Sequence, residues 1–279
     1  MAEELRRVRA RMSARAGGAA VTDGAHRSTQ DGSVLRLSGV TRRYGGVHAV
    51  DDVSLEVGRG ERRVIIGPNG AGKTTLFKLI SRLERVSGGR IELFGTDITR
   101  MAPHRVARLG LGRTYQITSV FPQLPVIENV MLAVQGLQRS KFGILRAVMR
   151  HKPTVAKASE TLERVGLNDV ADVPAAALGH GQQRQLDLGL ALATEPKLLL
   201  LDEPAAGLAG ADRGMIRELV RGLSEDITVM LIEHDMELAL GLADRVTCLH
   251  EGSPVASGTP DEIKANERVQ SIYLGAGGD

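Results

Sequence analysis

The sequence predicts an α/β protein with a core of parallel strands and helices, preceded by an antiparallel β subdomain and interrupted by an inserted α-helical subdomain. Three observations support this fold class. Short apolar runs typical of buried parallel strands, such as 64–66 and 198–201, alternate with segments of helical periodicity. A glycine-rich loop at 67–75 joins one such strand to a helix. Prolines then punctuate predicted helical stretches within 117–180.

The loop at 67–75 reads GPNGAGKTT and matches the phosphate-binding pattern G-x-x-x-x-G-K-[ST]. Glycines lack a Cβ atom, so successive backbone N–H groups can turn inward around a polyphosphate. Lys73 adds a mobile positive charge, and the Thr74 hydroxyl is suited to bind Mg²⁺. The alternative is an ordinary glycine-rich turn, which would not require a strand before it and a helix after it. We predict that this phosphate loop binds a nucleotide through Gly67, Pro68, Asn69, Gly70, Ala71, Gly72, Lys73, Thr74 and Thr75.

The segments on either side of the loop have clear periodicity. Apolar residues from Leu76 to Leu83 recur at i, i+3, i+4 and i+7, which predicts a one-sided helix with its N-terminus at the anion. Before the loop, residues at 34–37 and 50–57 alternate between apolar and polar, with a turn at 44–46 between them. This pattern predicts an antiparallel sheet that leads into the core.

Composition limits the classes of function. The chain has 279 residues, 42% of them hydrophobic, which allows a sizeable core. The formal net charge is only +3 and the basic residues are spread along the chain, so no nucleic-acid groove is expected. Cys248 is the single cysteine, which excludes an intramolecular disulfide and suits the cytosol. No apolar run approaches the roughly 20 residues that span a bilayer. Residues 1–33, rich in Arg, Ala and Gly, are predicted to be a flexible extension.

Between the loop and the next motif, the sequence changes from mixed to helical. A strand is predicted at 88–94, and a helix at 103–109 that Gly110 stops. Gln116 follows, and a lone glutamine is weak evidence for any function. Within the predicted helical subdomain, the helices are expected at 129–134, 145–149 and 156–165.

A pair of acids follows the apolar run at 198–201. This run is expected to be a buried parallel strand, and it ends in Asp202 and Glu203. Open α/β sheets bind ligands at the carboxyl ends of such strands. Asp202 could hold Mg²⁺ through water, and Glu203 could accept a proton from an attacking water. The alternative is a strand end with two solvated acids, which the phosphate loop upstream makes less favourable.

The last part of the chain continues the alternation. A strand is predicted at 227–232, followed by His234, which in isolation is more often structural than catalytic. Asp235 is placed to cap the next helix. A hairpin is predicted within 245–258, and the capping box at 259–262 predicts that one last helix begins there.

The ordered set of motifs resembles the ATP-binding cassette (ABC) transporter ATPases over residues 34 to 275. The motifs are the phosphate loop, Gln116, LGHGQQR at 178–184, LLLLDEP at 198–204 and IEHD at 232–235. Within that family, segments similar to the ATPase subunits of branched-chain amino acid importers lie at 110–130, 201–208 and 252–275. The resemblance implies a RecA-like P-loop NTPase core. It divides the chain into the extension, an ABC ATPase domain at 34–258 with a helical subdomain at about 117–180, and a C-terminal helix and tail at 259–279.

The resemblance also implies roles for single residues, with ATP and Mg²⁺ as cofactors. Tyr44, which on its own is a half-buried strand tyrosine, would stack on adenine. Gln116 would reach Mg²⁺ and the attacking water, and His234 would contact the γ-phosphate. Asp202 and Thr74 would bind the metal. Glu203 would act as the catalytic base.

The signature motif departs from the family pattern. Most members have LSGGQ where this chain has LGHGQ at 178–182, so Gly179 replaces a serine that contacts the γ-phosphate of the partner's ATP. A hydrogen bond to a charged group contributes roughly 1.5–3 kcal/mol, so its loss could weaken a closed dimer or slow turnover. The Gly181 N–H still offers an anion site at a helix N-terminus, and His180 could compensate. The trans contacts are therefore assigned to Gly179, His180, Gly181 and Gln182.

By resemblance, the chain is the ATP-hydrolysing subunit of an importer of branched-chain amino acids or a related small amide. Its expected partners are a second ABC ATPase subunit, identical or paralogous, membrane permease subunits and, indirectly, a substrate-binding protein, with no nucleic acid. It would work at the cytoplasmic face of the membrane. The alternatives are a lipopolysaccharide-export ATPase, a non-transport ABC ATPase and a subunit that binds ATP without hydrolysis. Non-transport members carry coiled-coil, zinc-binding or second-cassette insertions, which this sequence lacks.

Overall fold

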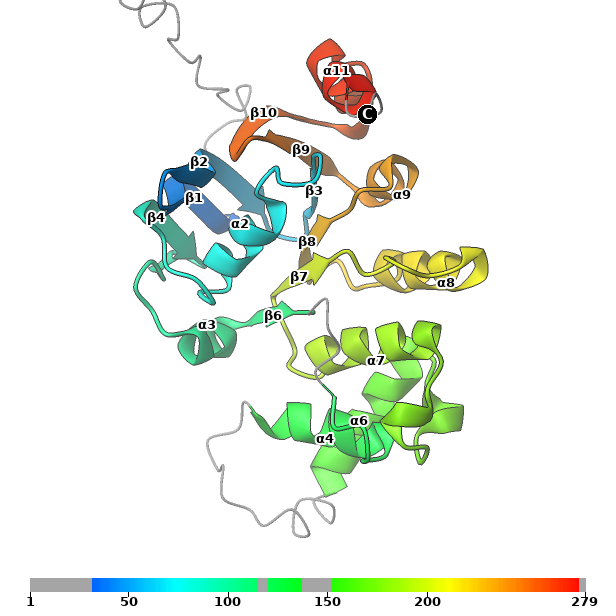
Figure 1. The fold of residues 1–279 in the computed structure, drawn as a ribbon. Helices are drawn as coiled ribbons and strands as arrows, with labels where there is room; N and C mark the ends of the chain where they lie inside the picture. The colour runs from blue at the N-terminus through cyan, green and yellow to red at the C-terminus, as the bar shows by residue number, and fades with distance from the viewer. Residues whose placement is uncertain (1–31, 115–119, 137–151, 276–279) are drawn as a thin grey trace, which may run out of the picture.

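The computed structural model describes residues 32–114, 120–136 and 152–275, which form two sheets with helices around them (Figure 1). The strands are β1 (Ser33–Tyr44), β2 (Val47–Gly58), β3 (Arg62–Ile66), β4 (Gly88–Leu93), β5 (Thr96–Asp97), β6 (Leu111–Arg113), β7 (Leu198–Asp202), β8 (Thr228–Ile232), β9 (Arg245–His250) and β10 (Ser253–Gly258). The helices are α2 (Lys73–Ile80), α3 (Pro103–Leu109), α4 (Val126–Gly136), α6 (Lys152–Val165), α7 (His180–Leu192), α8 (Gly210–Arg221), α9 (Met236–Leu242), α10 (Pro260–Lys264) and α11 (Glu267–Gly275). In these described ranges, no helix is long and apolar enough to span a bilayer.

The first sheet is antiparallel and has the strand order β2-β1-β4-β5. β1 and β2 form a hairpin in which Tyr44 pairs with Val47 across a two-residue turn. The predicted antiparallel sheet is therefore confirmed, although both strands extend beyond 34–37 and 50–57. Register shifts along the β1–β2 pair mark bulges, which bend and twist long strands.

The second sheet has six strands in the order β10-β9-β3-β8-β7-β6. Every neighbouring pair is parallel except the β9–β10 hairpin. Because parallel strands share one direction, the carboxyl ends of β3, β8 and β7 lie at one edge of the sheet. The segments that follow these ends are the phosphate loop, the stretch at 233–235 and the stretch at 202–204.

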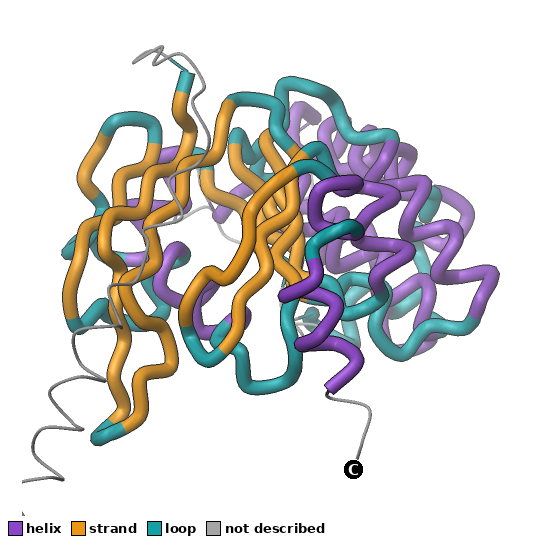
Figure 2. Tube along the Cα trace, turned by 90° about the horizontal axis from the view of Figure 1, so that it is seen from above, coloured by secondary structure: helices purple, strands orange, loops and turns teal. Residues whose placement is uncertain are grey.

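The six-stranded sheet is buried on both faces. Successive strand residues point to opposite sides of the sheet, and both sets of side chains are buried. Leu199 and Leu201 of β7 pack in the cluster that includes α7, α8 and α9 residues. Leu198 and Leu200 pack in the cluster formed with α2 and the antiparallel sheet. Figure 2 shows the antiparallel sheet at one side, most helices at the other, and the six-stranded sheet between them. Such burial explains the uninterrupted apolar run at 198–201.

α4 and α6 lie within the predicted helical subdomain, and they pack on each other and on α7, which follows it, through a shared apolar cluster. The stretches 129–134 and 156–165 are helical, but both helices begin earlier than predicted. Pro153 lies in the first turn of α6, where a helix tolerates proline because the first N–H groups have no partner within the helix. Two short 3₁₀ turns, Asn168–Val170 and Ala175–Ala177, lead to α7. The predicted helix at 145–149, Gln116 and residues 1–31 of the extension lie outside the described residues.

Two predicted elements need correction. α2 ends at Ile80, and Leu83 is 47% exposed, so it does not extend the apolar face of that helix. Arg82 adopts a positive φ of 61°, which turns the chain away before Leu83. The capping box at 259–262 does begin a helix, with mutual bonds between Thr259 and Glu262. However, the prediction of one last helix was wrong, because α10 ends at Lys264 and α11 follows.

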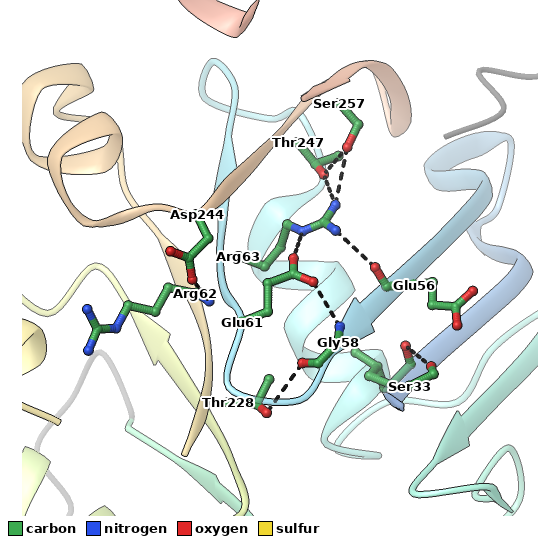
Figure 3. Close-up of polar contacts among 11 residues, drawn as sticks. Ser33, Glu56, Gly58, Glu61, Arg62, Arg63, Thr228, Asp244, Thr247 and Ser257 are labelled. Carbon is green, nitrogen blue, oxygen red and sulfur yellow. Dashed lines mark hydrogen bonds and ion pairs between the residues drawn. The ribbon is translucent and has the colours of Figure 1, made fainter. Parts of the chain in front are cut away.

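A buried arginine connects the two sheets. Arg63 of β3 is 1% exposed and donates through Nε to Glu61 Oε1 at 2.5 Å (Figure 3). Its Nη2 donates to the Glu56 carbonyl of β2 at 3.0 Å. Its Nη1 donates to the hydroxyls of Thr247 in β9 at 3.1 Å and Ser257 in β10 at 3.2 Å. One guanidinium group therefore joins strands of both sheets and fixes the antiparallel subdomain against the core.

Candidate functional site

The phosphate loop is held in a conformation that only glycine permits at two positions. Gly67 has a φ of 148°, and a Cβ atom there would lie 2.2 Å from the Leu249 carbonyl oxygen. Gly72, the residue before α2, has a φ of 96°, and a Cβ atom there would lie 2.2 Å from the Ala49 carbonyl oxygen. The loop backbone thus packs directly on the backbones of β9 and β2. This close approach explains why the sequence has glycines at both positions.

Lys73 begins α2, and its ammonium group lies against the loop that precedes it. Its Nζ donates to the carbonyl oxygens of Gly67 at 2.6 Å and Pro68 at 3.0 Å. Burial lowers the pKa of the Lys73 ammonium, while Glu203 and Asp202 act in the opposite direction. Asn69 and Gly70 at the loop tip are exposed, and Thr74 and Thr75 are half-buried in the first turn of α2. The loop residues predicted from sequence therefore lie together between the end of β3 and the first turn of α2.

The two acids after β7 have different surroundings. Asp202 is 3% exposed, and its pairing with Ile232 places it at the end of the ladder between β7 and β8. Glu203 is more accessible, with a side chain that is 24% exposed. The Glu203 backbone has a positive φ of 50°, which is uncommon for a residue with a side chain. Its N–H donates to the Ile232 carbonyl at 3.1 Å, so the turn between the acids is fixed by β8.

Arg113 is a partner of Asp202 that sequence reasoning missed. Its Nη2 lies 3.1 Å from Asp202 Oδ2, and its Nη1 donates to Ser81 Oγ at 2.7 Å. Burial raises the pKa of Asp202, and the Arg113 guanidinium opposes this shift in part. The other carboxylate oxygen, Asp202 Oδ1, is buried and has no hydrogen-bond partner among the described residues. Nothing in the local sequence distinguishes Arg113 from an ordinary strand residue.

His234 lies next to Glu203 at the sheet edge. Its Nδ1 is 3.8 Å from Glu203 Oε2, and its side chain is 59% exposed. Asp235 accepts the Leu238 N–H at 3.1 Å and caps α9, as the sequence predicts. Glu233, which precedes the histidine, is only 1% exposed, and burial raises the pKa of its carboxyl group. The sheet edge thus brings together the phosphate loop, Asp202, Glu203 and His234.

Tyr44 lies at the end of β1 and is 43% exposed. The Arg42 guanidinium carbon is 4.4 Å from the centre of the tyrosine ring. The Tyr44 hydroxyl donates to the Glu84 carboxylate, beyond the C-terminal end of α2. These contacts fix the orientation of the ring, but they do not join Tyr44 to the phosphate loop.

The signature residues are in a different part of the molecule. Gly179 precedes α7, and its N–H donates to Gln182 Oε1 at 3.1 Å. His180 is exposed. A Cβ atom on Gly181 would lie 2.7 Å from the carboxyl carbon of Asp212 in α8, so a side chain at this position requires the Asp212 side chain to move. Figure 1 shows α7 with the helical subdomain, whereas α2 and its loop lie on the other side of β7.

A phosphate loop after β3 and two acids at the end of β7, with β8 between these strands, lie at one edge of a parallel sheet and define a nucleotide-binding P-loop protein. The chain belongs to the ABC transporter family of ATP-binding proteins, which couple ATP hydrolysis to transport. Residues 50–206 match the family described as ABC transporter. Residues 253–279 match the family described as Branched-chain amino acid ATP-binding cassette transporter.

The chain is similar over most of its length to curated relatives. It is 37% identical over 251 residues to the high-affinity branched-chain amino acid transport ATP-binding protein LivG of Salmonella typhimurium, covering 87% of this chain and 98% of that protein. It is 37% identical over 249 residues to BraF of Pseudomonas aeruginosa, described in the same words, with the same coverage. The resemblance to ATP-binding subunits of branched-chain amino acid transporters is therefore confirmed.

Solved structures agree with this assignment. A crystal structure of the ADP conformation of an ATP-binding cassette of an ABC transporter is 30% identical, covers 87% of this chain and 99% of its own, and has a TM-score of 0.76. A nucleotide-free cassette from an ABC transporter is 29% identical, with 86% and 98% coverage and a TM-score of 0.73. The predicted ABC ATPase fold is confirmed.

Proposed function

We propose that this chain is the ATP-hydrolysing subunit of an importer of branched-chain amino acids or a related small amide. The observation that supports this most directly is the 37% identity to LivG along 98% of that protein, joined to the C-terminal match at 253–279. The relatives found do not favour the lipopolysaccharide-export alternative or a non-transport ATPase.

In this proposal the phosphate loop binds the triphosphate of ATP. Its N–H groups and the N-terminus of α2 attract the anion, and Lys73 exchanges the carbonyls of Gly67 and Pro68 for phosphate oxygens. Each exchanged contact replaces a neutral acceptor by a charged one, which strengthens the hydrogen bond. Tyr44 presents a half-exposed ring for adenine to stack on.

The residues at the sheet edge also fit a magnesium ion. Asp202 Oδ1 is a buried carboxylate oxygen without a hydrogen-bond partner among the described residues, and such an atom is costly unless a cation or donor reaches it. Asp202, Thr74 and Gln116 would hold Mg²⁺, directly or through water. When bound, the ion neutralises charge on the phosphate oxygens during phosphoryl transfer. Mg²⁺ is commonly held by one or two carboxylates together with substrate phosphates.

Hydrolysis requires a base, and Glu203 is the side chain placed for it. It is partly exposed at the strand end, so it can accept a proton from a water molecule that attacks the γ-phosphate. His234, with its Nδ1 3.8 Å from Glu203 Oε2, lies beside the base and contacts the γ-phosphate. Gln116 positions the same water. The bond from the Glu203 N–H to the Ile232 carbonyl holds the Glu203 backbone at this edge.

A complete site requires a second chain. Figure 1 shows that α7, whose N-terminus carries the signature residues, lies on the other side of β7 from α2 and the phosphate loop. The signature residues Gly179 to Gln182 therefore close the site of another subunit, identical or paralogous. ATP then links two subunits, and hydrolysis separates them. A membrane permease receives this motion, and a substrate-binding protein supplies the cargo. The chain would therefore lie at the cytoplasmic face of the membrane.

Deletion of the gene in its own host tests the transport assignment. The deletion should reduce uptake of radiolabelled leucine, isoleucine and valine at low concentration. The wild-type gene should restore uptake, whereas Glu203→Gln should not, because the assembled transporter cannot hydrolyse ATP. Urea and lactose uptake serve as comparisons. Unchanged uptake of all three amino acids would contradict the assigned substrate class, and a selective loss of urea uptake would transfer it to small amides.

A further inference from the structure

A tyrosine near the C-terminus contacts the first glycine of the phosphate loop. The Gly67 N–H donates to the Tyr273 hydroxyl at 2.7 Å, although the two residues are 206 positions apart in the sequence. Gly67 follows directly after β3, whose pairing with β9 ends at Ile66 and Cys248. A side chain thus takes the place of the next ladder acceptor and satisfies a buried N–H group at the start of the loop.

The geometry around Gly67 leaves little freedom for this N–H. Gly67 is buried and packs against the Leu249 carbonyl. The Gly252 N–H, in the β9–β10 turn, donates to the Ala71 carbonyl at 3.2 Å, which fixes the middle of the loop. Two of the contacts that hold the loop backbone therefore come from residues in the C-terminal part of the chain.

The helix that carries Tyr273 is anchored in the core. Val269 is 1% exposed, and Ile272 and Tyr273 pack partly buried on the same apolar cluster, at i+3 and i+4 from Val269. α11 packs against β10 (Figure 1). Burial raises the pKa of Tyr273 to about 12, so its hydroxyl stays protonated at physiological pH. A neutral hydroxyl oxygen can accept the Gly67 N–H throughout that range.

Tyr273 also lies beside the helix that follows His234. A hollow of about 410 Å³ is lined by Tyr273, Val269 and Ile263 together with Met236 and Leu240 of α9. On the other side, Ser271 and Ile272 of α11 line a hollow of about 550 Å³ with residues 68–71 of the loop. α11 is therefore placed between the phosphate loop and the start of α9.

We propose that Tyr273 is a positioning residue of the nucleotide site, through which α11 holds Gly67 and sets the conformation of the phosphate loop. This inference rests on the proposed binding of ATP by that loop. Without the hydroxyl, the Gly67 N–H has no acceptor at that position, and the loop can rotate to find one. The N–H groups that follow in the loop then no longer converge on the phosphates. The C-terminal segment is thus part of the nucleotide site.

The substitution Tyr273→Phe tests this, because it removes the hydroxyl and keeps the ring that packs on the core. We expect the Kd for ATP, measured by calorimetry, to rise roughly 3- to 10-fold, the effect of one hydrogen bond. The KM for ATP should rise together with the Kd, while kcat changes less than about twofold. The reason is that the variant weakens ATP binding equally in the ground state and the transition state. Hydrogen–deuterium exchange at residues 64–72 should become faster.

Gln270→Ala is the matched control. Gln270 lies in the same helix as Tyr273, and the variant removes the bond from Gln270 Nε2 to the Lys264 carbonyl of α10 at 2.9 Å, which does not involve the phosphate loop. Its Kd should equal that of the wild type. A wild-type Kd in Tyr273→Phe, or an equal rise in Gln270→Ala, would overturn the inference. Lys73→Ala distinguishes failure of this inference from failure of the proposed function. If this variant binds ATP as well as the wild type, the loop is not the ATP site, and both claims fail.

Discussion

Tyr44, at the end of β1 in the antiparallel sheet, is the residue on which we propose that the adenine base stacks. Tyr44 is held by two contacts, the Arg42 guanidinium at its ring and the Glu84 carboxylate at its hydroxyl. Arg42 Nε also lies 3.4 Å from Glu84 Oε2, and Lys78 Nζ lies 3.7 Å from Glu84 Oε1. The ring is thus oriented before any ligand binds, which reduces the entropy lost on stacking.

Tyr44→Ala should raise the KM for ATP about tenfold and weaken the preference for ATP over GTP, because stacking on an aromatic ring contributes roughly 1–3 kcal/mol. Tyr44→Phe keeps the ring and loses only the Glu84 contact, so its KM should stay near that of the wild type. Steady-state kinetics with both nucleotides measure the difference. Identical kinetics for Tyr44→Ala and the wild type would leave Tyr44 with a structural role alone.

Arg63 illustrates a residue whose role is stability. Arg63→Ala should lower the free energy of unfolding by about 3–5 kcal/mol, because it leaves the partly buried Glu61 carboxylate without its ion-pair partner. Arg36→Ala is the control, since the Arg36–Glu56 pair is about half exposed, and it should cost less than about 1 kcal/mol. Denaturant unfolding measures both. Equal losses of unfolding free energy in the two variants would contradict the role of Arg63 in joining the two sheets.

At the scale of elements, the start of α7 is where this chain differs from the common signature motif. Gly179 has a φ of −66°, and the nearest atom to a Cβ there, Gln182 Oε1, is 3.9 Å away, so a side chain fits. Gly181 is the opposite case, since a Cβ would clash with Asp212. The start of α7 can therefore accept the missing serine at Gly179, whereas a side chain at Gly181 displaces the Asp212 side chain.

Gly179→Ser, made in a Glu203→Gln background that preserves ATP, should strengthen ATP-dependent association of subunits about tenfold, because it adds a hydrogen bond to a charged phosphate. Analytical ultracentrifugation with and without ATP measures the association. Gly181→Ala should weaken it, since the Asp212 side chain must move. Association that is unchanged by Gly179→Ser would show that the serine hydroxyl is not needed in this chain.

Some elements could be predicted from the sequence because their signals are local. The phosphate loop, the buried strand at 198–201 and the Asp235 cap each depend on a few neighbouring residues. The extent of α2 could not be predicted, because the turn at Arg82 interrupts an apolar repeat that Leu83 continues.

Other features depend on contacts between distant segments. Arg113 reaches Asp202 across 89 positions. Tyr273 reaches Gly67 across 206 positions. No spacing rule in the sequence reveals such pairs, so the candidate site was predicted as a set of motifs without the side chains that hold them. The split of the C-terminal helix into two was missed for a similar reason, because a capping box marks where a helix begins and not where it ends.

At the scale of the whole molecule, one sheet edge gathers the residues that we propose bind and hydrolyse ATP, and the signature lies elsewhere, at the start of α7. The six-stranded sheet is covered on both faces, so its carboxyl edge is where the loops that carry these groups can meet a ligand. The separation between α7 and the phosphate loop makes a second chain part of the proposed mechanism. Within one subunit, α11 joins the C-terminal segment to the same edge.

Steady-state ATP hydrolysis by the purified chain, wild type against Glu203→Gln, tests the assignment of this edge as the catalytic site most directly. Glu203→Gln should reduce kcat by at least about 100-fold, the contribution of a general base, because glutamine cannot accept the proton. ATP affinity, measured on the same preparations, should stay close to that of the wild type, because the phosphate loop is intact. Near-normal turnover in Glu203→Gln would contradict the assignment.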